Sequence, residues 1–149
     1  MNNILKTAAL VIALAVLPLA PAMPQNKGVI VVANDLPITD YDITQKMNLL
    51  KVLGSDTSRM SRKEILQSLI NDVVKLAEAK RLNASATTGD VTGQIERIAK
   101  NLKMDGDGLI SKLKERGVAP EFFRRYVAAQ IGFNRVIGIS KKQPEKAVV

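Results

Sequence analysis

The chain has 149 residues, which suits one ordinary domain and is short for two. It contains no His, Cys or Trp, and this excludes an imidazole base, a thiolate nucleophile, a disulfide, and His or Cys metal ligands. Its 22 basic and 14 acidic residues give a net charge of +8, which permits nucleic acid, anionic lipid or acidic polypeptide as a partner but selects none of them.

Residues 1–22 have the three parts of a secretory signal peptide. Lys6 gives a positive start, residues 8–17 form an apolar run, and Ala20 and Ala22 form the small-x-small pattern that signal peptidase requires. An uncleaved membrane anchor is disfavoured, because the run has only half of the roughly 20 residues that a spanning helix needs. Cleavage after Ala22 would leave 127 of the 149 residues and, since Lys6 is removed, a charge one lower, +7. We therefore predict an exported protein without stable membrane insertion, and export argues against nucleic acid as a partner.

A small β-hairpin is expected next. Val29–Ala33 is a β-branched run of strand length, Asn34 and Asp35 supply a turn, and residues 36–38 form a second extended piece. Pro37 has no backbone N–H to donate on its outer side, so the second strand must lie at a sheet edge. A two-stranded hairpin is marginal alone, so this one must pack on the rest of the chain.

Five amphipathic helices are expected after the hairpin. Thr39 and Asp42 form a capping box that starts the first helix, and Gly54 ends it. The longest predicted helix covers Arg62–Arg81 and has one apolar stripe with charges on the opposite face.

The last three helices have equally clear starts. Thr87 and Asp90 form a second capping box, Asp105 can cap a short fourth helix, and Pro120 suits the first turn of a fifth helix that runs to about Ile137. The predicted fold is therefore mostly α-helical, a short hairpin followed by a five-helix bundle over residues 28–138. Residues 139–149 are predicted to be a disordered charged tail.

Motifs for metal or phosphate chemistry are not supported. Residues 105–108, Asp-Gly-Asp-Gly, suggest a calcium loop, but Leu109, Ile110 and Arg116 occupy positions where an EF-hand needs a ligand, a glycine and a carboxylate. No glycine-rich phosphate loop is present. Asp40 and Asp42 are better explained by the helix dipole and by capping than by acid catalysis. No catalytic residue, cofactor or metal is therefore expected.

The aromatic residues are concentrated in the last predicted helix. Of the five aromatic residues in the chain, this helix contains four: Phe122, Phe123, Tyr126 and Phe133. Phe122 and Phe123 are adjacent, so they point about 100° apart and cannot both face one narrow stripe. Either this helix supplies the centre of the core, or one of the two lines a groove or partner surface. The clusters of Lys and Arg mostly lie opposite apolar stripes, as expected of solvated helix faces.

The order of these landmarks resembles the N-terminal domain of the SurA family of exported chaperones and foldases. The opening of that domain is matched by VIVVANDLPITDYDITQKMNLL, and its long helix is matched by RKEILQSLINDVVKLAEAKRLNASATTGDV. The later helices are matched by IERIAKNLKMDGDGLISKLKERGVAPEFFRRYVAAQI. The resemblance covers approximately residues 29–136.

The resemblance implies a periplasmic domain that binds unfolded polypeptides, chiefly outer-membrane proteins. Family members usually continue into parvulin-type prolyl isomerase domains, where their catalytic His residues lie; this chain has no such segment and no His, so isomerase activity is not expected. The first hypothesis is therefore a client-binding domain without catalysis. The alternative is a structural subunit that forms a homodimer or docks on a partner that supplies the missing foldase segment. The predicted client- or partner-binding residues are Met47, Leu50, Phe122, Phe123 and Tyr126.

Overall fold

The computed structural model describes residues 28–142, and it confirms a mostly helical fold that begins with a two-stranded antiparallel hairpin. The predicted signal peptide, with Ala20 and Ala22, lies outside the described residues. The elements in chain order are β1 (Val29–Ala33), β2 (Leu36–Thr39), α1 (Asp40–Val52), α2 (Arg62–Arg81), α3 (Thr88–Asn101), α4 (Gly106–Glu115) and α5 (Pro120–Lys142).

The hairpin is closed by a two-residue turn with left-handed backbone at both positions. Asn34 has φ 45° and Asp35 has φ 62°, a conformation that Asn and Asp tolerate better than most residues. Ala33 pairs with Leu36 and Val32 with Pro37, and a bulge interrupts the register between Val29 and Val31. In the described residues the sheet has these two strands only, so β2 is an edge strand, as Pro37 predicts.

Side-chain caps start the first four helices. The predicted capping boxes at Thr39 and Thr87 are both present, and Asp105 accepts a hydrogen bond from the backbone N–H of Gly108. A third capping box, in which Ser61 and Glu64 satisfy each other's backbone N–H groups, starts α2. The pattern Ser-x-x-Glu is visible in the sequence but was not among the predictions.

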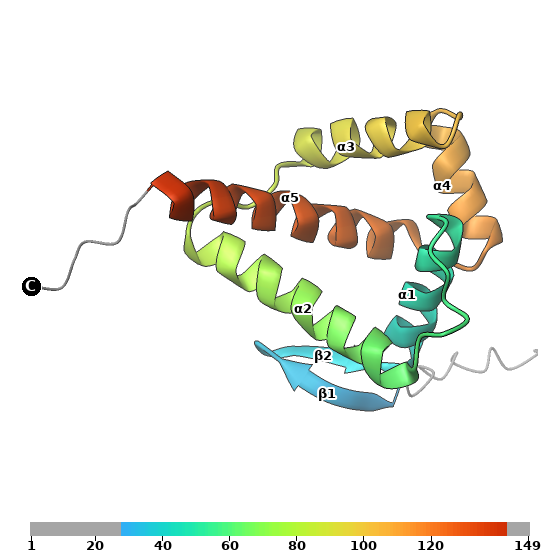
Figure 1. Cartoon of the computed structure of the whole chain (residues 1–149), viewed down its shortest axis with the longest axis horizontal. Helices are drawn as coiled ribbons and strands as arrows, with labels where there is room; N and C mark the ends of the chain where they lie inside the picture. Colours follow the sequence, from blue (N-terminus) through green and yellow to red (C-terminus); the bar gives the residue numbers. More distant parts are fainter. Residues whose placement is uncertain (1–27, 143–149) are drawn as a thin grey trace, which may run out of the picture.

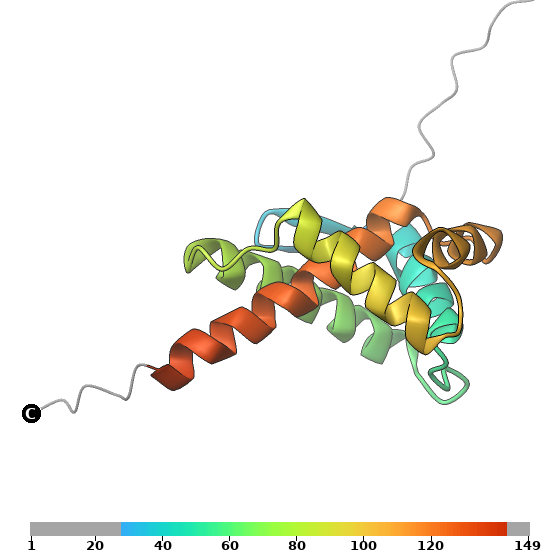
Figure 2. The same ribbon diagram turned by 90° about the horizontal axis from the view of Figure 1, so that it is seen from above.

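Helix α5 forms the centre of the helical body, between α2 on one side and α3 on the other (Figure 1). Seen from above, α3 crosses over α5, and α1 and α4 lie together at one end (Figure 2). Helix α5 packs tightly against α2 at Gly132, where an added Cβ would lie 2.6 Å from the Cβ of Ala79. The apolar core draws on β2 and all five helices: Ile38, Ile43, Leu49, Ile65, Leu69, Val91, Ile95, Ala99, Leu109, Leu113, Val118, Phe122, Phe123 and Val127.

The connection between α4 and α5 is fixed to α1 by a buried glutamine. Gln45 is 3% exposed. Its Nε2 donates to the carbonyl oxygen of Gly117 at 2.6 Å, and its Oε1 accepts from the backbone N–H of Ala119 at 2.6 Å. Both polar groups of one side chain are therefore satisfied by the backbone that leads into α5.

Helix α5 is longer than predicted. The expected end was about Ile137, with a disordered tail from residue 139, but the helix continues to Lys142. Ser140 and Lys141 are compatible with helix, and the next residue in the sequence that disfavours a helix is Pro144. The disorder predicted for residues 139–142 is thus wrong, and residues 143–149 lie outside the described part of the chain.

Candidate functional site

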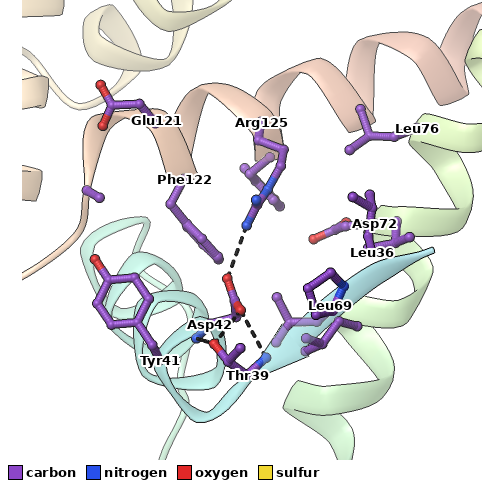
Figure 3. Close-up of a pocket in the computed structure, with 15 residues that line it drawn as sticks. Leu36, Thr39, Tyr41, Asp42, Leu69, Asp72, Leu76, Glu121, Phe122 and Arg125 are labelled. Atoms are coloured by element: carbon purple, nitrogen blue, oxygen red, sulfur yellow. Dashed lines mark hydrogen bonds and ion pairs between the residues drawn. The ribbon is translucent and has the colours of Figure 1, made fainter. Parts of the chain in front are cut away.

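A cleft with a volume of about 430 Å³ opens between β2, the first turn of α1, the middle of α2 and the start of α5 (Figure 3). Segments that are far apart in sequence thus meet around one hollow. Most of the lining side chains are apolar, and the polar ones are mainly carboxylates and one arginine. The lining residues are Leu36, Pro37, Ile38, Thr39, Tyr41, Asp42, Leu69, Asp72, Val73, Leu76, Ala119, Glu121, Phe122, Arg125 and Tyr126.

The apolar walls come from opposite sides of the cleft. Leu69, Val73 and Leu76 recur at helical spacing along α2, and Phe122 faces them from the first turn of α5. Leu36 of β2 is 47% exposed, so its side chain is available at the surface of the cleft. The cleft is thus lined by apolar side chains on two sides.

One ion pair crosses the mouth of the cleft. The Oδ1 of Asp42 accepts from Nη2 of Arg125 at 3.2 Å, while its Oδ2 accepts from the backbone N–H and the hydroxyl of Thr39 at 3.0 and 2.6 Å (Figure 3). The guanidinium of Arg125 also lies 5.3 Å from the ring centroid of Phe122. Asp42 therefore serves both as the N3 residue of the capping box of α1 and as an anchor for α5.

A partly buried polar cluster adjoins the cleft. Lys46 is 1% exposed; its Nζ donates to Oδ2 of Asp72 at 2.6 Å and lies 4.2 Å from the ring centroid of Tyr126. The Oδ1 of Asp72 accepts from the amide of Gln130 at 3.1 Å and has the Nζ of Lys75 at 3.8 Å. The charge of Lys46 is thus paired with a carboxylate and faces an aromatic ring.

The surroundings shift the pKa of two groups in this cluster. Burial lowers the pKa of Lys46 from its ordinary value, and the negative charge of Asp72 opposes that shift. Burial raises the pKa of Tyr126, and the charge of Asp72 adds to the increase. The Asp72 carboxylate already has Lys46 and Gln130 as partners. The cluster is therefore suited to holding α1, α2 and α5 together.

Within residues 28–142, no group of three or more Asp or Glu side chains is placed to hold a metal ion. None of the helices in this part of the chain is both long and apolar enough to cross a membrane.

The structure separates the five predicted binding residues. Phe122 and Tyr126 line the cleft, whereas Phe123 is fully buried in the core. Met47 lines a different hollow beside residues 54–58, and Leu50 is half-buried and packed against the core. Both adjacent phenylalanines belong to the core, but only Phe122, which is 7% exposed, also lines the cleft.

Sequence reasoning missed the contributions of β2 and α2 to this cleft. Leu36 and Pro37 were expected only as hairpin residues, and Leu76 only as part of a core-facing stripe. One available signal was Lys46, a charged residue placed three positions from both Ile43 and Leu49 on the buried face of α1. A polar residue at such a position indicates a buried partner, which here is Asp72.

Comparisons with protein-family models, curated proteins and solved structures found no match to this chain.

Proposed function

We propose that this chain is an exported, periplasmic chaperone-like domain that binds unfolded polypeptides without catalysing a reaction on them. The observation that carries the proposal is the cleft between β2, α2 and α5, whose apolar walls surround an open hollow of about 430 Å³. The resemblance of the sequence to the SurA N-terminal domain supports unfolded outer-membrane proteins as clients. The sequence contains no His or Cys, so a role in binding explains the site more simply than catalysis does.

The expected affinity is weak, as reversible protection of a client requires. Each 100 Å² of apolar contact contributes roughly 2.5 kcal/mol at about 25 cal/mol per Å². Loss of translational and conformational freedom by an unfolded client offsets most of this free energy. A client would therefore be held transiently through its apolar side chains and released to fold.

A light-scattering assay with an unfolded β-barrel protein tests the proposal directly. The mature protein at stoichiometric concentration should suppress aggregation, and Leu36→Asp should weaken the suppression by placing a charge in the cleft. Val74→Asp is the matched control, because Val74 is 49% exposed on α2 but does not line the cleft. No suppression by the wild-type protein, or equal effects of the two substitutions, would refute the role of the cleft.

The same apolar cleft also fits the alternative of a structural subunit with one permanent partner. Sedimentation of the mature protein distinguishes the two roles, because a tight dimer or a single stable complex would favour the structural subunit. A proline-peptide isomerisation assay should show no acceleration, and acceleration would contradict binding without catalysis.

A further inference from the structure

The outer edge of β1 is unusually apolar for an exposed strand. Val29 is 59%, Ile30 37% and Val32 61% exposed, and Val29–Ala33 contains no charged residue. Soluble proteins commonly protect such edges with Lys, Pro or a covering element, because an open edge can pair with another chain. In Figure 1, β1 is the outer strand at the margin of the helical body.

The free edge of β2, on the other side of the same sheet, cannot donate hydrogen bonds to an added strand. In a hairpin with a two-residue turn, the residues beside the turn form the hydrogen-bonded pair, here Ala33 and Leu36. The nitrogen of Pro37 therefore points away from β1, where proline has no hydrogen to donate. The next outward N–H belongs to Thr39 and is already bonded to Asp42 at 3.0 Å.

The edge of β1 has the opposite character. Val32 pairs with Pro37 in the non-hydrogen-bonded position, so its backbone N–H and C=O both face outward from the hairpin. Outside the pairing of β1 with β2, neither of these two backbone groups forms a backbone hydrogen bond within residues 28–142. The sheet can thus be extended at β1 and is blocked at β2.

We propose that β1 takes up an extended segment of a client polypeptide as an additional strand. Main-chain hydrogen bonds to Val32 would hold the segment irrespective of its detailed sequence, and the exposed side chains of Ile30 and Val32 select apolar residues at alternate positions. Because the edge has no charge, an uncharged segment suits it best. This inference rests on the proposed client binding but assigns a second surface, separate from the cleft.

A second copy of this chain is a poorer occupant of the same edge. β1 has five residues, whereas a standard stable protein interface has about 20–30 residues on each side. Pairing of two β1 edges alone would therefore be too small for a stable dimer. A transient strand from an unfolded client needs no larger area.

The test uses the mature protein and a blocked, fluorescently labelled eight-residue peptide of alternating Val and Thr. Val32→Pro removes the outward N–H while leaving the hairpin's own hydrogen bonds, as Pro37 does on the opposite strand. Val32→Thr is the matched control, since it keeps the N–H and the β-branched shape. We expect Val32→Pro to weaken peptide binding at least about fivefold and Val32→Thr by less than about twofold.

Hydrogen exchange of the Val32 amide in the wild-type protein gives a second readout that needs no variant. The amide should exchange rapidly in the free protein and become protected when the peptide binds. Unchanged exchange, or equal peptide affinity of the two variants, would overturn the proposal. Self-association of the wild-type protein that is lost in Val32→Pro would also overturn the proposal, because it would show that a second copy of the chain occupies the edge of β1. Protection of the Val32 amide by the peptide, together with a failure to suppress client aggregation, would refute the proposed function but not the strand addition.

Discussion

Replacement of Gln45 by leucine should destabilise the domain and disturb the start of α5. The two hydrogen bonds of Gln45, each 2.6 Å long, satisfy the carbonyl of Gly117 and the N–H of Ala119. Leucine has a similar volume but no polar group, so it would leave both backbone groups without their partner. Ala119 directly precedes α5, whose first turn places Phe122 in the cleft.

The expected loss follows from those two unpaired groups. A buried polar group without a partner costs about 1–3 kcal/mol. About 1–2 kcal/mol per group applies here, because the segment between α4 and α5 can relax toward water. The sum is about 2–4 kcal/mol, a large fraction of the stability of a typical domain. For a domain of this size it corresponds to a decrease in Tm of roughly 10 °C.

Urea denaturation followed by circular dichroism measures this loss. Gln67→Leu is the control, because Gln67 is exposed on α2 and its hydrogen bond to Asn71 is local; its effect should stay within about 0.5 kcal/mol. Gln45→Glu provides a further check. Its carboxylate would face the Gly117 carbonyl, and the variant should regain stability relative to wild type as pH falls and the carboxyl becomes able to donate. A Gln45→Leu loss below about 1 kcal/mol would refute the reasoning.

Two further predictions concern the packing of α5 and acid stability. Gly132→Ala should destabilise the fold by about 1–2 kcal/mol, because the new Cβ would lie 2.6 Å from the Cβ of Ala79. The control is Gly138→Ala, which lies at an open position in the same helix and should be neutral or stabilising. Thermal denaturation of the two variants measures the difference. Hydrogen bonds from Thr87 lower the pKa of Asp90 to about 2, so its contribution to stability is complete above pH 4 and is lost as pH falls toward 2. Asp90→Asn should therefore narrow the stability gap to wild type over that interval, and a constant gap in pH-dependent melts would contradict this.

Local sequence signals were sufficient to predict most of the secondary structure. The turn at Asn34 and Asp35, the capping boxes at Thr39 and Thr87, and the start of α5 at Pro120 each depend on residues within a few positions of one another. Such short-range signals can be recognised in a single sequence. The end of α5 was harder to predict, because nothing between Ile137 and Pro144 forces a helix to stop.

The cleft was predictable only in part, because it depends on contacts between distant segments. The aromatic pair suggested that Phe122 or Phe123 lines a groove, but the opposite wall comes from Leu36 and from Leu76, which lie on other elements. Leu76 also belongs to an apolar stripe of the kind that usually faces a core. Which part of that stripe stays open is decided by the distance between α2 and α5, and no local pattern encodes that distance.

Three polar residues of α1 hold the start of α5 in place beside the cleft. Asp42, Gln45 and Lys46 have the spacing i, i+3 and i+4, so they lie on one face of the helix. This face contacts α5, or the residue directly before it, at three points. Asp42 pairs with Arg125, and Gln45 bonds to the backbone of Ala119. The Nζ of Lys46 lies over the ring of Tyr126. Hydrogen bonds and ion pairs are directional, so they can fix the position of α5 next to the cleft. The cleft is therefore formed in the free protein, and a client would not have to open it.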